Sequence, residues 1–259
     1  MRKIFFCLVL FYSCFGFANE ESLSSFSKAL DKTLRHLNRS ESRPCNSDNS
    51  LTPSSSDLVL FENKSATALS KKDAQNLFND LQHKSDIPYE FSLAGCEQRA
   101  HEMSRLLLLK GITPLKAFVS VDEDESPRLQ VPHPQKKGQV IRWKYHVAPV
   151  VLVKENGQLV PYVIDPSIEN KIVPLTEWRS HMTRHDSKIK VRTEITVANQ
   201  FDVDGRLKAD FKNQEFNRSN QESLREFKRY SQDPDGEENY LFQLQRNEER
   251  MMMIDSSEY

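Results

Sequence analysis

The stretch Tyr145–Ser167, YHVAPVVLVKENGQLVPYVIDPS, decides the fold. Two apolar runs flank the pair Asn156 and Gly157, a pattern typical of a β-hairpin closed by a two-residue turn. Each run also holds one residue that a strand does not need, His146 in the first and Asp165 in the second. The hairpin therefore raises the question of what these two side chains do.

The register of the hairpin predicts that they meet. A two-residue turn places Asp165 opposite Ala148, so His146 and Asp165 become diagonal neighbours on one face. The backbones are then about 7 to 8 Å apart, a gap that an imidazole and a carboxylate can bridge by a hydrogen bond. Pro149 has no N–H to donate, and a one-residue bulge beside it would move His146 to the opposite face. The prediction depends on an unbroken register.

A cysteine at the start of a predicted helix offers a nucleophile. The segment AGCEQRAHEMSRLLLLKG, residues 94–111, consists of good helix formers between two glycines, so Cys96 lies in the first turn. One face of this helix carries Cys96, Ala100, Met103 and Leu107. The N–H groups and dipole of a helix start favour a thiolate. The alternative is a buried cysteine that acts as a small hydrophobe.

The first residues predict export. Arg2 and Lys3 precede an apolar run that ends in small residues, as in a signal peptide, and we expect cleavage after Ala18. The run is shorter than the roughly 20 apolar residues of a membrane span. We therefore expect a periplasmic or secreted protein without stable membrane association.

Charge and cysteine content exclude two further classes. Cleavage removes two of the 36 basic residues and leaves all 37 acidic ones, so nucleic acid is not an expected partner. Of the four cysteines only Cys45 and Cys96 follow the cleavage point, which is too few for a disulfide scaffold. A disulfide between these two stays open, and it would make Cys96 either latent or purely structural.

The chain divides into four parts by composition. After the signal peptide, residues 19–85 are polar and form a loosely packed leader, with helices expected at Ser22–Leu37 and Lys71–Leu81. Residues 86–200 hold the catalytic domain, and residues 201–259 form a charged helical extension.

Metal and cofactor sites are not expected. His181 and His185 have the i, i+4 spacing of two metal ligands, but their surroundings are polar and no third ligand is evident. His101 lies about 140° around the helix from Cys96 and does not reach the thiol.

Three motifs in this order carry a family resemblance. The segments GCEQRAHEMSRLLLLKG, WKYHVAPVVLV and VIDPS, the last followed by EWR, resemble the bacterial protein-glutaminase family. Its members are exported enzymes that deamidate glutamine side chains in proteins, with a core similar to transglutaminases and papain-like enzymes. The resemblance implies an α+β fold with a catalytic helix packed on an antiparallel sheet, and the residue pattern of the leader and the tail adds helical N- and C-terminal extensions.

The resemblance also implies roles for the three residues. Cys96 is expected to be the nucleophile, His146 the general base and acid, and Asp165 the residue that orients the imidazole. Proteins bearing exposed glutamine are the implied substrates, and residues 19–85 are expected to be the counterpart of the pro-region with which family members are made. The alternatives are a transglutaminase or cysteine protease on the same core, or a non-enzymatic exported binding protein.

Overall fold

The computed structural model of the chain describes residues 57–121, 127–133 and 136–257. The predicted signal peptide, the helix predicted at 22–37 and Cys45 lie outside these residues. The described residues up to Glu237 belong to one compact unit, whereas helix α7 (Gly236–Ser257) lies almost wholly in a second.

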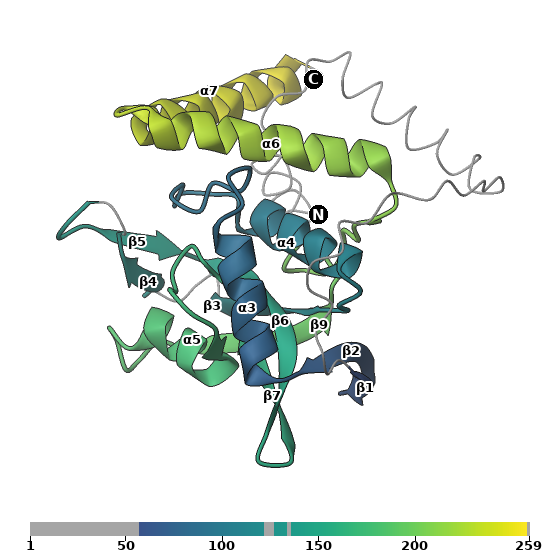
Figure 1. Cartoon of the computed structure of the whole chain (residues 1–259). Helices are drawn as coiled ribbons and strands as arrows, with labels where there is room; N and C mark the ends of the chain where they lie inside the picture. The colour runs from purple at the N-terminus through teal and green to yellow at the C-terminus, as the bar shows by residue number, and fades with distance from the viewer. Residues whose placement is uncertain (1–56, 122–126, 134–135, 258–259) are drawn as a thin grey trace. The chain divides into compact units, whose positions relative to one another are not determined.

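A mixed sheet forms the centre of the compact unit (Figure 1). Its strands in the described residues are β1 (Asp57–Phe61), β2 (Lys64–Leu69), β3 (Leu115–Val121), β6 (Tyr145–Glu155), β7 (Gln158–Val163), β8 (Val173–Pro174) and β9 (Val191–Val197). The order is β1-β2-β6-β3-β9, with β7 paired to β6 and β8 to β7. The pairing of β2 with β6 is parallel and the other pairings are antiparallel. The sheet is therefore not purely antiparallel as expected, although the α+β class is confirmed.

Strand β6 runs through the sheet because it is apolar on both faces. Residues 146–153 are continuously buried, as in a strand covered from both sides. Asn156 and Gly157 turn the chain with φ of 49° and 79°, the positive values that a type I′ turn requires. Strand β7 then pairs from Gln158, opposite Glu155, without a bulge. The predicted register of the hairpin is confirmed.

Helices cover both faces of the sheet. They are α3 (Lys71–Gln82), α4 (Cys96–Leu109), α5 (Leu175–Thr183) and α6 (Gln214–Gln232). On one face, Phe78 of α3 and Leu107 of α4 share a core with Val151. On the other face, Trp178 of α5 packs in a core with Ala148. A separate hairpin of β4 (Leu129–Pro132) and β5 (Val140–Trp143) lies beside the sheet.

Residues 57–82 belong to this core. Ala68 and Leu69 of β2 are fully buried, and so is Phe78 of α3. The pairing of β2 with β6 is long-range, so the short and partly polar strands β1 and β2 gain their structure from tertiary contacts. The expectation of a loosely packed leader is therefore wrong for residues 57–82. Whether a leader is removed stays a prediction.

The C-terminal region is helical, as predicted. Leu224 and Phe227 of α6 are buried, and the Asn220 side-chain amide donates to the Gln98 carbonyl of α4 at 3.2 Å. Helix α6 therefore packs on the helix that begins with Cys96. Among the described residues, none of the helices has the length and apolar character needed to cross a membrane.

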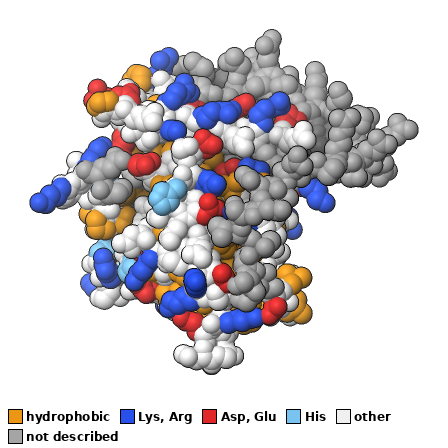
Figure 2. Space-filling model, in the orientation of Figure 1, with side chains coloured by type: hydrophobic (Ala, Val, Ile, Leu, Met, Phe, Trp, Pro, Cys, Tyr) orange, Lys and Arg blue, Asp and Glu red, His pale blue; other side chains and the backbone are white. Residues whose placement is uncertain are grey.

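Charges of both signs are mixed on the surface. On the face shown in Figure 2, basic and acidic side chains alternate over the described residues, with small hydrophobic areas at the periphery. The exposed large hydrophobic side chains include Leu58 and Leu60 of β1 and Leu109 of α4.

Candidate active site

Cys96 is the first residue of α4, as predicted. Gly95 precedes it with φ of +86°, a left-handed conformation that brings the chain into the helix. A Cβ atom on Gly95 would lie 2.8 Å from the Phe227 ring, so α6 closes directly over the helix start. The Cys96 side chain is half-buried and packs against a core cluster formed by Ala100 of α4, Phe118 of β3 and Val147 of β6, the neighbour of His146 in that strand.

His146 and Asp165 are joined as the hairpin register predicted. His146 Nε2 lies 2.8 Å from Asp165 Oδ2, and both side chains are buried. Because an ionised carboxylate only accepts hydrogen bonds, Nε2 carries the hydrogen of this bond. The lone pair of the neutral ring is then on Nδ1, which is buried and has no hydrogen-bond partner among the described residues.

Three further groups fix the carboxylate of Asp165. The Trp178 indole N–H donates to Oδ2 at 2.9 Å, and the backbone N–H of Ser167 donates to Oδ1 at 3.2 Å. The Ser167 hydroxyl also donates to Oδ1. Burial alone would raise the pKa of Asp165, but the charge of His146 and the hydrogen bonds from His146, Ser167 and Trp178 outweigh it and lower that pKa. The ionised form is the one that this site holds.

Two tryptophans orient the imidazole. The Trp143 ring stacks on His146 with centroids 4.8 Å apart and an interplanar angle of 12°, and Trp178 lies at 5.6 Å. The Trp143 indole N–H is itself anchored on the Ser92 carbonyl at 2.8 Å. Both tryptophans belong to the sequence motifs quoted above, but nothing in their spacing assigned them to the histidine.

Glu97 is a site residue that the sequence analysis missed. Its carboxylate is 4% exposed, and one oxygen lies 3.3 Å from the Cys96 sulfur, which can donate to it. The other oxygen accepts the hydroxyl of Tyr145, the residue before His146. A glutamate in the first turn of a helix is normally explained by its favourable interaction with the helix dipole. The sequence alone therefore did not indicate a role beside the thiol.

The remaining histidines lie apart from this group. His101 is fully buried and bonds Asn217 of α6 at 2.9 Å. His181 Nδ1 lies 2.6 Å from a carboxylate oxygen of Glu169, and His181 Nε2 lies 3.8 Å from a carboxylate oxygen of Glu177. The sequence did not indicate that these carboxylates lie close to His181. No group of three metal-binding side chains occurs within the residues that the structure describes.

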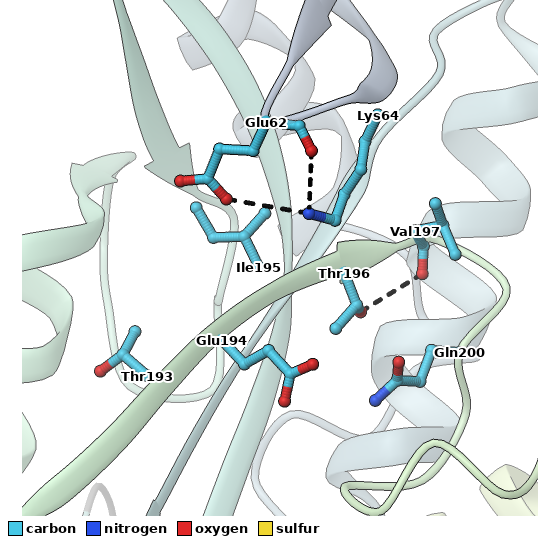
Figure 3. Close-up of a pocket in the computed structure, with 8 residues that line it drawn as sticks. All are labelled: Glu62, Lys64, Thr193, Glu194, Ile195, Thr196, Val197 and Gln200. Carbon is cyan, nitrogen blue, oxygen red and sulfur yellow. Dashed lines mark hydrogen bonds and ion pairs between the residues drawn. The ribbon is translucent and has the colours of Figure 1, made fainter.

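Two open grooves lie elsewhere on the unit. One, of about 370 Å³, is lined by the β1–β2 turn with Glu62 and Lys64 and by β9 (Figure 3). The other, of about 560 Å³, lies between the end of α4 and residues 208–212. Neither is lined by Cys96, His146 or Asp165, so the chemistry of the residues, rather than a large cavity, identifies the candidate site.

Several solved structures are similar to the chain. The chain is similar to a crystal structure of protein-glutaminase with 23% identity and a TM-score of 0.49, over 62% of this chain and 90% of that one. An NMR structure of protein-glutaminase from Chryseobacterium proteolyticum has 22% identity and a TM-score of 0.48, over 59% and 85% of the two chains. A crystal structure of a mutant of pro-protein-glutaminase has 21% identity and a TM-score of 0.50, over 70% and 63%.

At these identities the structural likeness concerns the fold alone. No curated protein matches the chain. The sequence model of the family described as glutaminase matches residues 74–182, a segment that contains Cys96, His146 and Asp165. The match covers less than half of the chain, so the similarity to the glutaminase family is a property of this segment.

Proposed function

We propose that the protein is a cysteine amidohydrolase that deamidates glutamine side chains in proteins, with Cys96, His146 and Asp165 as its catalytic residues. One observation carries the proposal above the others. The bond between His146 Nε2 and Asp165 leaves a buried ring nitrogen, Nδ1, without a partner among the described residues, and the strand that carries His146 contributes to the core cluster on which Cys96 packs.

The reaction follows from these groups. His146 Nδ1 takes the thiol proton of Cys96, and the sulfur attacks the carboxamide carbon of glutamine. The backbone N–H of Cys96, at the helix start, is available to the oxyanion of the tetrahedral intermediate. His146 returns the proton to the departing ammonia, which leaves a thioester. Water activated by His146 hydrolyses the thioester to glutamate and regenerates the thiol.

Competing activities would use the same catalytic residues but transfer the acyl group to an acceptor other than water, or attack an amide bond other than that of the glutamine side chain. An amine in place of water would make the enzyme a transglutaminase, and attack on a backbone amide would make it a protease. Ammonia release from a glutamine-rich protein without formation of cross-links or fragments is the outcome specific to deamidation.

The decisive experiment compares variants in that assay. Cys96→Ala and His146→Ala are expected to abolish ammonia release, and the double variant to be little worse than either alone, because members of such a unit act together. His185→Ala removes an exposed histidine and is the matched control. Substantial ammonia release by Cys96→Ala would refute the proposal.

We further propose that the protein acts outside the cytoplasm after cleavage behind Ala18. The proposal depends on the charged start, short apolar run and small residues at the expected cleavage point. N-terminal sequencing of the protein recovered from periplasm or medium should begin at Asn19. An intact Met1 would contradict cleavage.

A further inference from the structure

Lys116 of β3 is a buried ammonium group close to the candidate nucleophile. The side chain has no exposed surface, and Nζ donates to the Gln200 carbonyl at 2.7 Å and lies 5.7 Å from the centre of the Phe201 ring. Burial of an ammonium costs several kcal/mol unless a negative charge compensates it. A carbonyl and an aromatic face supply only partial charge, so the position calls for an acidic neighbour.

The strand pattern puts Lys116 on the same face of the sheet as Cys96. Successive residues of a strand alternate between faces, so Lys116 and Phe118 share one. Phe118 belongs, with Ala100 of α4, to the core cluster on which Cys96 packs. Glu97, the second residue of that helix, brings its buried carboxylate to 3.3 Å from the thiol. A buried acid therefore contacts Cys96, and a buried base lies on the strand face that carries the core cluster of Cys96.

The three groups interact through their charges. Burial lowers the pKa of Lys116 to about 7, whereas negative charge on Glu97 and on Cys96 raises it. Such an interaction is mutual: a thiolate that favours the ammonium is favoured by it to the same extent. Negative charge on Glu97 acts on the thiol in the opposite sense, because like charges repel.

We infer that Lys116 and Glu97 are positioning residues that set, with opposite signs, the pH at which the Cys96 thiol ionises. Lys116 supplies the counter-charge of the thiolate, and Glu97 holds the resting thiol as a hydrogen-bond donor. When the S–H bond breaks, the proton moves to His146 or to water. No bond forms or breaks at Lys116. The inference rests on the proposed function only in so far as Cys96 is the nucleophile.

Other charged or titratable groups lie on the elements that pack around Cys96. They are Arg99 of α4, Tyr145 and His146 of β6, in addition to Glu97 and Lys116. The Arg99 guanidinium donates to the carbonyls of Phe91 and Ala94, at 2.8 and 3.0 Å, which holds its charge on the loop before α4. Helix α6 presents the uncharged Asn220 and Phe227 to this region.

The test is the pH dependence of Cys96 alkylation by iodoacetamide in the full chain, followed by mass spectrometry of the peptide that contains it. Lys116→Met should raise the pH of half-maximal alkylation rate by about one unit, which corresponds to about tenfold less thiolate at a fixed pH below that midpoint. Glu97→Gln should lower the same midpoint. Glu102→Gln is the matched control, because Glu102 is an equally buried carboxylate on the same helix, paired with Arg105. It should leave the midpoint in place.

Opposite shifts separate this role from a structural one, since loosened packing would move both profiles alike. The inference is wrong if the midpoint pH of Cys96 alkylation is unchanged in both variants, or if it shifts in the same direction in both. If Lys116→Met does not fold, Glu97→Gln decides alone, because a glutamine can still accept the Tyr145 hydroxyl. Alkylation needs no substrate, so the shifts stand or fall independently of ammonia release.

Discussion

Asp165 carries the most densely hydrogen-bonded carboxylate of the candidate site. Asp165 accepts hydrogen bonds from the His146 ring, from the Trp178 indole N–H, and from the backbone N–H and hydroxyl of Ser167. A carboxylate with this many donors has no freedom to rotate, so it fixes both the orientation of the imidazole and its tautomer. The sequence predicted the His146–Asp165 pair from register alone. It could not predict Trp178, because that contact crosses from the sheet to a helix that packs on it.

Replacement of Asp165 by asparagine tests this role. Asp165→Asn should reduce turnover about a thousandfold or more, since an amide neither selects the tautomer nor stabilises the imidazolium. The measurement is the rate of ammonia release well below the unfolding temperature. Trp178→Phe, which removes only one donor, should lose far less. A wild-type rate for Asp165→Asn would mean that Asp165 merely caps the turn before Pro166.

His101 gives the fold a dependence on acid. Burial lowers its pKa from 6.5 to about 4, and its Nδ1 is buried without a partner among the described residues. Between these two pH values the unfolded chain binds more protons than the folded one, so stability falls as the pH drops from 6.5 towards 4. At about 1.4 kcal/mol per pKa unit, the total loss is about 3 kcal/mol.

The pH dependence of the free energy of unfolding checks this expectation. His101→Gln keeps a donor or acceptor for Asn217 but does not titrate, so its curve should be flatter between pH 4 and 6.5. The exposed His185→Ala should keep the wild-type slope. An unchanged slope in His101→Gln would assign the acid sensitivity to other groups.

The hairpin and helix α4 were predictable because their signals are local. Asn156 and Gly157 specify the turn, and the period of the apolar residues specifies the helix face. Strands β1 and β2 were missed because they are short and partly polar, and their pairing partner, β6, lies far along the chain. Lys116 was missed for a related reason. A lysine in a strand is normally exposed, and only the tertiary fold shows that this one is buried.

Helix α3 supplies a direct test of the corrected boundary. Phe78→Ala should lower the free energy of unfolding by about 3–5 kcal/mol, since the ring is fully buried between helix and sheet. Denaturant unfolding monitored by circular dichroism measures the loss. Leu58→Ala, at an exposed position of β1, should cost well under 1 kcal/mol. If Phe78→Ala changes the free energy of unfolding only slightly, the residues up to 82 are loosely packed after all.

The boundary also changes what proteolytic activation can mean for the protein as a whole. A pro-region that extended to residue 85 would take β1, β2 and α3 with it, and with them part of both cores. Any activating cleavage that preserves the fold must therefore fall before Asp57. In the sequence before Asp57, Arg35 and Arg39 are trypsin sites, whereas the bond between Arg43 and Pro44 is not.

Limited trypsin treatment followed by parallel assays tests inhibition by the leader. We expect cleavage before Asp57 to raise both the rate of Cys96 alkylation and the rate of ammonia release. Cleavage sites are identified by intact mass. If both rates stay unchanged after complete cleavage, the leader is not inhibitory, and if both fall with a loss of stability, it is structural.

The contact between Phe227 and Gly95 has a consequence for biosynthesis. The ring that closes over the start of α4 belongs to a helix synthesised long after it, and Gly95 offers no side chain to fill the space in the meantime. Until α6 has been synthesised, the backbone around Cys96 thus lacks the Phe227 ring as one of its walls. Cys96 reaches its final surroundings only after residue 227 has emerged, which delays maturation of the candidate site well beyond the synthesis of its own helix.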